Sequence, residues 1–215
     1  MKINKELTEN NKPMKEKVGI MGGTFNPIHN GHLLLAETAR ESLNLDRIMF
    51  MPSGNSYMKE TSQILDGDTR AQMVRLALLG NPYFLFSDLE LKREGATYTC
   101  DTLAILTAQN PQTQYYFILG EDNLLTLMYW KNPAFILQNC VIAGAVRASE
   151  DNTRIKEAAE LLKKEYQADI RILPARRIDI SSSDIRERLK SGQSVRYMLP
   201  ERVYDYIQKN RLYRG

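Results

Sequence analysis

An apolar strand followed at once by two glycines and an amphipathic helix is the feature that most constrains this chain. KVGIMG at 17–22 is apolar, Gly23 follows, and residues 31–43 carry apolar side chains at helical spacing. We expect Gly22 and Gly23 to let the backbone turn tightly, which exposes amides beside the positive end of a helix dipole. The unit therefore predicts an anion-binding α/β fold. G-x-G-x-x-G and G-K-[ST] are both missing, so it is neither a dinucleotide fingerprint nor a P-loop.

Short apolar runs alternate with amphipathic stretches along the rest of the chain. Strands are predicted at 17–22, 47–52, 83–90, 114–120, 140–146 and 169–174, and helices at 31–43, 68–80, 99–110, 153–166, 181–191 and 200–212. Strands separated by helices favour right-handed crossovers, and hence a Rossmann-like, doubly wound parallel sheet with C-terminal helices. Residues 1–16 have no period and predict a flexible N-terminal extension, whereas 17–215 predict one catalytic domain.

Composition excludes several classes of protein. The formal charge is only +3, and acids interleave with the basic residues, so solvated helix faces explain the charge better than a nucleic-acid groove. No apolar run approaches the roughly 20 residues of a membrane span, and the first residues lack the apolar core of a secretory signal. The two cysteines have no paired spacing, which favours a reducing compartment. We expect a cytoplasmic protein with no nucleic-acid or membrane partner.

His29 and His32 are the two histidines of the chain, and both lie between the glycines and the helix. Three residues apart at a helix start, they can face one cavity from consecutive turns. A single histidine here would be read as a helix cap or a core residue, but the pair favours a catalytic role. A zinc site would need two more ligands, and Cys100 and Cys140 stand apart in sequence, so no protein-bound metal is predicted.

A second candidate site lies in IDISSSDIRERL at 178–189, where three serines precede a predicted helix. An ordinary N-cap accounts for the serines about as well as a ligand does. However, the hydroxyls of Ser182 and Ser183, a helix N-terminus and Arg186 one turn later together form a plausible anion site, because a guanidinium can fork onto two phosphate oxygens.

Together these segments resemble the motifs of the nucleotidyltransferase superfamily. GGTFNPIHNGH at 22–32 is similar to its H-x-G-H signature, and ISSSDIR at 180–186 to its I-S-S-[ST]-x-I-R motif. REGATYTCDTL at 93–103 and FILGEDNLLTLMYWKNP at 117–133 resemble the bacterial nicotinate-nucleotide adenylyltransferases within it. The resemblance implies transfer of AMP from ATP to nicotinate mononucleotide by a nucleotidyltransferase domain, giving deamido-NAD and pyrophosphate in NAD biosynthesis.

The resemblance also implies roles for single residues. The catalytic residues would be His29, His32 and Arg186. ATP would be bound by Gly22, Gly23, Thr24, Phe25, His29, His32, Asp122, Ser182, Ser183 and Arg186. Nicotinate mononucleotide would be bound by Thr24, Phe25, Lys59, Thr99 and Trp130. Mg²⁺ would be held mainly by ATP phosphates.

Structural roles stay open for several of these residues. Trp130 could instead be a packing residue, Thr99 a helix N-cap and Asp122 a local cap. Arg93 and Arg147 are weaker candidates as anion partners. The family's Pro-Pro-His-Lys loop reads NSYMKE here, which keeps Lys59 but places Met58 where the histidine is usual.

Competing functions are a different acceptor, a relative that binds tRNA, and a protein that senses ATP without turnover. Nicotinamide mononucleotide and phosphopantetheine are the alternative acceptors, and the segment around Trp130 disfavours the second. The chain lacks a Lys-Met-Ser-Lys-Ser loop and a basic tRNA surface, and sensing would not need the histidine pair. A homo-oligomer is a further option, because the apolar stripe of Val203, Tyr206 and Ile207 could pack on its own domain or on a second copy.

Overall fold

The computed structural model describes residues 15–54, 64–147, 153–175 and 179–214. Most of the extension predicted at 1–16 lies outside these residues, and the first strand begins at Glu16. Met58 and Lys59 also lie outside them.

Six parallel strands form the centre of the molecule, as predicted. They are β1 (Glu16–Gly23), β2 (Arg47–Pro52), β3 (Phe84–Phe86), β4 (Thr113–Gly120), β5 (Val141–Arg147) and β6 (Ile170–Ala175). Their order in the sheet is β3-β2-β1-β4-β5-β6, so the chain winds outward in both directions from β1 and β4. Ligand sites of such sheets lie beyond the carboxyl ends of the strands where this reversal occurs. The fold predicted from sequence, a Rossmann-like doubly wound sheet with C-terminal helices, is confirmed.

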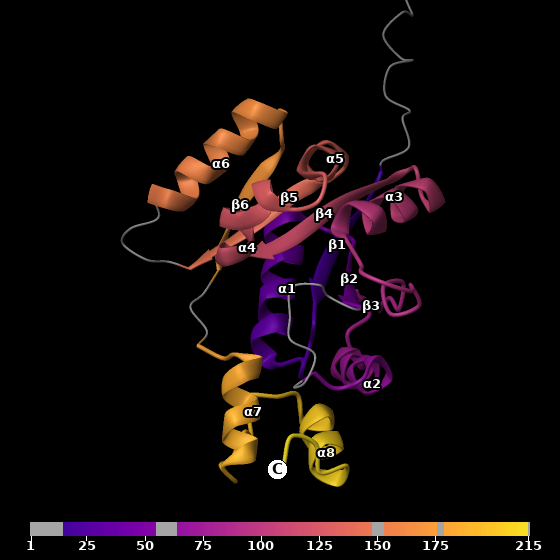
Figure 1. Cartoon of the computed structure of the whole chain (residues 1–215), viewed down its shortest axis with the longest axis vertical. Helices are drawn as coiled ribbons and strands as arrows, with labels where there is room; N and C mark the ends of the chain where they lie inside the picture. Colours follow the sequence, from indigo (N-terminus) through magenta and orange to yellow (C-terminus); the bar gives the residue numbers. More distant parts are fainter. Residues whose placement is uncertain (1–14, 55–63, 148–152, 176–178, 215) are drawn as a thin grey trace, which may run out of the picture.

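Helices cover both faces of the sheet (Figure 1). They are α1 (Asn30–Leu43), α2 (Gly67–Leu78), α3 (Thr99–Gln109), α4 (Glu121–Thr126), the 3₁₀ turn η2 (Leu127–Tyr129), α5 (Pro133–Asn139), α6 (Thr153–Tyr166), α7 (Ser182–Lys190) and α8 (Glu201–Lys209). One apolar cluster joins the sheet to α1, α2, α7 and α8, and a second joins it to α3, α4, α5 and α6. The molecule thus has three layers with a core on each side of the sheet.

Alternation along β4 assigns each side chain to one of these cores. Tyr115, Phe117 and Leu119 belong to the cluster that includes α3, while Tyr116 and Ile118 belong to the cluster that includes α1. Both faces of β4 are therefore apolar, which explains why the strand reads as a continuous run of buried residues in the sequence.

The largest differences from the elements predicted by sequence are at two places. The strand expected at 83–90 is ordered as a strand only at Phe84–Phe86, because β3 is an edge strand that pairs with β2 alone. Three short helical segments, α4, η2 and α5, lie in the stretch after β4 for which the sequence predicted no element. They are too short to show an amphipathic period, and only the Asn132 cap with Pro133 behind it marks the start of α5.

The apolar stripe of the last helix packs on its own domain. Val203 and Ile207 are fully buried in the cluster that joins α8 to α1 and α2, and Tyr206 packs against it half-exposed. The stripe therefore needs no second copy of the chain to cover it. Among the described residues, no helix has the length and apolar character needed to cross a bilayer.

Candidate active site at the carboxyl edge of the sheet

The segment between β1 and α1 turns at Phe25, not at the glycines. Gly22 and Gly23 are the last residues of β1 and pair in register with Met51 and Pro52, so the expected glycine turn is wrong. Phe25 instead has a φ of 49°, a left-handed value that costs free energy for a bulky residue. A Cβ at Gly23 would lie 3.3 Å from the ring of Phe25, a tight contact that a small shift of this ring would have to relieve.

The two histidines form one unit at the start of α1. Their rings stack with centroids 3.7 Å apart. The backbone N–H of His29, the N-cap residue, donates to Nδ1 of His32 at 3.2 Å. Because Nδ1 of His32 accepts a hydrogen bond, the proton of a neutral ring lies on Nε2. The ring of Phe25 also contacts His32, in a T-shaped arrangement with centroids 5.0 Å apart.

Burial makes the electrostatics of the pair unusual. His29 is only 6% exposed, and desolvation lowers its pKa to about 4. The ring is therefore neutral near pH 7. Its Nδ1 is buried and makes no hydrogen bond of normal geometry among the described residues, although the backbone N–H of His32 approaches the His29 side chain as in a capping box.

The three serines of the second motif have separate partners. Ser181 is the N-cap of α7, and its hydroxyl accepts from the N–H of Asp184 at 3.1 Å. Ser182 donates its hydroxyl to the carbonyl of Pro27 at 2.8 Å. Ser183 accepts from Nη2 of Arg186 at 3.2 Å. Helix capping thus accounts for one serine and leaves two for the site.

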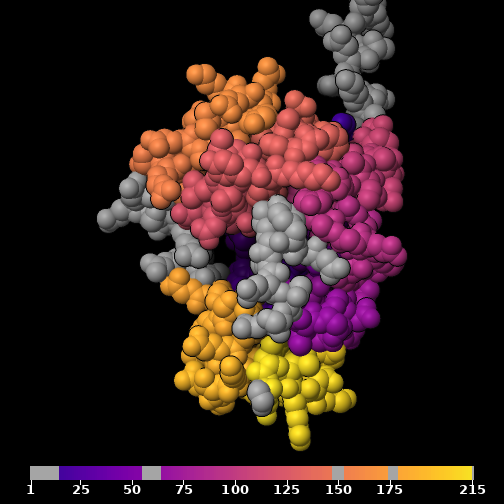
Figure 2. Space-filling model, viewed as in Figure 1, coloured from indigo at the N-terminus to yellow at the C-terminus, as the bar shows by residue number. Residues whose placement is uncertain are grey.

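Arg186 joins the two motifs directly. Its Nη1 donates to the carbonyl of Asn26 at 2.9 Å, although 160 residues separate them in sequence. The residues from Asn26 to His32 and those from Ser182 to Arg186 therefore meet at one edge of the sheet. Figure 2 shows a hollow with indigo atoms of the N-terminal part at its base, above α7 and α8. The convergence expected from sequence is present.

Trp130 stands close to the same edge. It lies at the end of η2, half-buried, with its ring edge-on to Phe117 of β4 at 6.2 Å between centroids. The ring of Phe117 in turn lies 3.7 Å from where a Cβ on Gly22 would be. Packing and ligand contact are thus compatible, since one edge of Trp130 packs while part of it remains exposed.

The other acceptor and ribose candidates lie at helix starts. Thr99 is the first residue of α3, but the N-cap is Tyr98, so the cap expected at Thr99 is displaced by one residue. Asp122 is exposed in the first turn of α4, directly after β4. This position is at the sheet edge that also holds Gly22 and Gly23.

The weaker cationic candidates differ in what they contact. Arg93 is half-buried and donates to the hydroxyl of Thr102 at 3.1 Å and to Asp101 at 3.4 Å, which ties it to the start of α3. Arg147 is the last residue of β5 and so lies at the expected edge. Lys59 stays a prediction, because it lies outside the described residues.

Three residues that were not among the predicted site residues help to hold the segment between β1 and α1. Arg70 of α2 donates to the carbonyl of Thr24 at 2.9 Å, and the hydroxyl of Tyr213 donates to Oδ1 of Asn26 at 2.8 Å. Asn26 stands inside the first motif, which is a local signal. Arg70 and Tyr213 lie in ordinary amphipathic surroundings and gave no signal.

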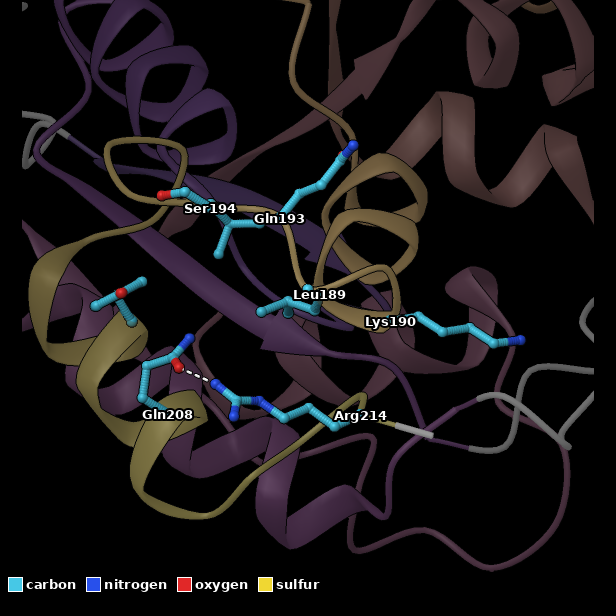
Figure 3. A pocket seen from close by; sticks show the side chains of 9 residues that line it. Leu189, Lys190, Gln193, Ser194, Gln208 and Arg214 are labelled. Carbon is cyan, nitrogen blue, oxygen red and sulfur yellow. Dashed lines mark hydrogen bonds between the residues drawn. The ribbon is translucent and has the colours of Figure 1, made fainter.

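A separate cavity lies between α7 and α8 (Figure 3). Its volume is about 450 Å³, and its lining includes Lys190, Gln193, Ser194 and Arg214. The polar side chains around it are exposed or half-buried, and Arg214 is bonded to Gln208 across it. Its lining does not include the two histidines or Ser181, Ser182 and Ser183, so it is distinct from the candidate site.

Comparisons with known proteins show what the chain is similar to. The family model described as cytidylyltransferase-like matches residues 20–188. A protein of Lachnoclostridium phytofermentans named probable nicotinate-nucleotide adenylyltransferase is 45% identical over 197 residues, which are 92% of this chain and 98% of that protein. A similarly named protein of Dehalococcoides mccartyi is 43% identical over 198 residues, with 92% and 97% covered.

Solved structures show the same fold at low sequence identity. The nicotinic acid mononucleotide adenylyltransferase of Plasmodium falciparum complexed with NaAD superposes with a TM-score of 0.74 at 19% identity. The match covers 92% of this chain and 97% of that one. A putative nicotinate-nucleotide adenylyltransferase of Vibrio parahaemolyticus gives a TM-score of 0.64 at 21% identity, with 93% and 96% covered.

Proposed function

Since this chain belongs to the cytidylyltransferase-like family, and within it to the nicotinate-nucleotide adenylyltransferases, we propose that the edge shared by the two motifs is where the reaction takes place. The enzyme transfers AMP from ATP to nicotinate mononucleotide and releases pyrophosphate, a step of NAD biosynthesis. The observation that carries the proposal is the 2.9 Å bond from Arg186 to the carbonyl of Asn26, because it unites two anion-binding segments from opposite ends of the chain.

The chemistry needs alignment more than proton transfer. An oxygen of the acceptor phosphate forms a bond to the α-phosphorus of ATP while the bond from that phosphorus to the bridging oxygen of pyrophosphate breaks. The electron pair leaves with pyrophosphate. The attacking oxygen is already anionic, so no general base is required, and catalysis rests on positioning and on neutralising charge at the phosphates.

The histidine pair would supply neutral donors to the reacting phosphates. The tautomer of His32 leaves Nε2–H as its donor, and burial of His29 keeps that ring uncharged. A neutral N–H can donate to the α-phosphoryl oxygens as charge shifts toward pyrophosphate. The amides of Gly23, Thr24 and Phe25 would add donors from the preceding turn.

The second motif would hold the leaving pyrophosphate. Ser182 and Ser183 lie in the first turn of α7, where the helix dipole favours an anion. In this structure, Arg186 donates from Nη1 to Asn26 and from Nη2 to Ser183. The phosphates of ATP would either accept from the remaining N–H groups of Arg186 or replace one of these two acceptors.

Magnesium would arrive with ATP. A group of three or more His, Cys, Asp or Glu side chains able to hold a metal is absent from the described part of the chain. The donors at the proposed site are imidazoles, amides, hydroxyls and a guanidinium, whereas Mg²⁺ prefers anionic oxygen ligands. Phosphate oxygens would therefore be its main ligands, and MgATP is the substrate.

The acceptor would lie on the β4 side of the histidines. Trp130 would stack on the pyridine ring, and Thr99 with the first amides of α3 would face the carboxylate, where a helix N-terminus favours negative charge. Lys59 would add a cation to the acceptor's anionic groups, and Asp122 would bind a ribose hydroxyl of ATP.

Pyrophosphate release from labelled ATP tests the function and its rivals together. The protein is incubated with MgATP and, separately, nicotinate mononucleotide, nicotinamide mononucleotide or phosphopantetheine. We expect release with nicotinate mononucleotide, a product with the mass of deamido-NAD, α-label in that product and γ-label in pyrophosphate. ATP binding without release from any acceptor would instead indicate a nucleotide sensor, and faster release with another acceptor would reassign the substrate.

A further inference from the structure

Arg70 is a buried cation that joins three segments at the proposed site. Its side chain belongs to α2 and is 5% exposed. Nη1 donates to the carbonyls of Thr24 and Ser53, each at 2.9 Å, and Nε donates to the carbonyl of Leu65 at 3.0 Å. These carbonyls follow β1, follow β2 and precede α2, respectively.

Burying the Arg70 guanidinium costs free energy, so stability alone does not explain why an arginine stands here. Burial lowers the pKa of Arg70, and the neighbouring groups Tyr213 and Asp66 oppose that effect only in part. The hydrogen bonds that its guanidinium donates within the described ranges go to carbonyls and not to a carboxylate. A buried charge held by neutral dipoles is weakly compensated, so its desolvation costs stability.

The same network reaches Asn26 by a second route. Leu65 accepts from Arg70 with its carbonyl and donates its own N–H to Oδ1 of Asn26 at 3.3 Å. Tyr213 donates to the same Oδ1 at 2.8 Å, and burial raises the pKa of this phenol, so it stays protonated as a donor. The segment is therefore held on both sides of Phe25.

Because the peptide bond is planar, the hydrogen bond to the Thr24 carbonyl also fixes the direction of the Phe25 N–H. In a trans peptide the carbonyl of Thr24 and the N–H of Phe25 point in opposite directions. The hydrogen bond from Arg70 orients the Thr24 carbonyl toward α2. The N–H of Phe25 is therefore directed away from α2. Phe25 needs this support, since its φ of 49° is one that a phenylalanine rarely adopts unaided.

We propose that Arg70 is a positioning residue: with Tyr213 and Asn26 it holds the Thr24–Phe25 peptide so that the Phe25 amide faces the reacting phosphates. The assignment rests on the proposed function for its kinetic consequence, but not for the peptide orientation itself. Lysine cannot replace Arg70, because a single ammonium on a flexible stem lacks the planar fork that spans three carbonyls.

Amide spectra test the orientation without any substrate. The chain has six phenylalanines, so protein labelled with ¹⁵N-phenylalanine gives six backbone cross-peaks, and the Phe25→Leu variant identifies that of Phe25. We expect Arg70→Lys to move the Phe25 peak and to leave those of Phe117 and Phe135, in the other core cluster, unmoved. The matched control is Arg75→Gln on the same helix, where the side chain is 48% exposed and lies 3.7 Å from Asp88.

Kinetics separate positioning from a merely structural role. Partial unfolding lowers kcat with the fraction of folded protein and leaves each KM unchanged. Loss of positioning raises KM for ATP and nicotinate mononucleotide, and kcat/KM of Arg70→Lys should fall about 10- to 100-fold. Arg75→Gln should retain native values. An unmoved Phe25 peak together with native KM values in Arg70→Lys would overturn the proposal.

Tyr213→Phe provides a second variant if Arg70→Lys does not fold. It removes one hydroxyl donor to Asn26 without uncovering a buried charge. We expect a smaller shift of the Phe25 peak in the same direction as any seen for Arg70→Lys, and a rise of about 2- to 5-fold in KM. A Phe25 peak and KM values identical to native would again refute the proposal. If the native enzyme itself releases no pyrophosphate, the proposed function fails, and the spectra still decide the orientation.

Discussion

Replacing His29 by asparagine should remove a specific acid sensitivity of the fold. Burial lowers the pKa of His29 to about 4 in the folded protein, whereas an unfolded histidine has a pKa near 6.5. Above pH 6.5 the ring is neutral in both states and contributes no pH dependence. As the pH falls below that value the unfolded chain binds a proton that the folded chain does not, so stability decreases with falling pH.

The size of the effect follows from the two pKa values. At pH 5 the unfolded ring is almost fully protonated and the folded ring is about 90% neutral, so the free energy of unfolding falls by about 2 kcal/mol. The loss levels off below pH 4. For a chain of this length, about 2 kcal/mol corresponds to a Tm shift of roughly 4–8 °C.

Urea unfolding at pH 7.5 and pH 5 measures this fall in the free energy of unfolding. Carboxylates also titrate over this range, but they contribute to the native protein and to His29→Asn alike, so the difference between the two isolates the imidazole. We expect the native protein to lose about 2 kcal/mol more than the variant. Equal losses in both proteins would show that His29 is not buried as a neutral ring.

Three further substitutions test the site. His32→Ala should lower kcat by about 10²- to 10⁴-fold with unchanged far-ultraviolet circular dichroism, because it removes a donor from developing charge; near-native turnover would refute the role. Arg186→Ala should chiefly raise KM for ATP, by about tenfold or more, and an ATP titration like that of the native enzyme would move the pyrophosphate site elsewhere. Trp130→Ala should raise KM for nicotinate mononucleotide about 2- to 10-fold and leave KM for ATP near native, whereas a loss of stability with both KM values unchanged would make Trp130 a packing residue only.

The sequence predicted the doubly wound sheet well because its signals are local. Apolar runs, helical spacing and end signals such as the acid that opens the helix predicted at 68–80 act over a few residues and survive in the fold, where Asp68 lies in the first turn of α2. The short helices after β4 were missed because six or seven residues are too few to display a period. The left-handed residue was also misplaced: two glycines suggested the turn, but Phe25 takes it.

By itself, the sequence determined the order of the strands and the longer helices along the chain. It also determined the two motifs that carry the histidines and the serine–arginine group. Tertiary structure alone decided what those groups touch. Arg186 reaches Asn26 and Arg70 reaches Thr24 because α7 and α2 pack against the same face of the sheet, across separations of 160 and 46 residues. Periodicity describes neighbours along one element, whereas such contacts depend on how distant elements dock, which no local pattern records.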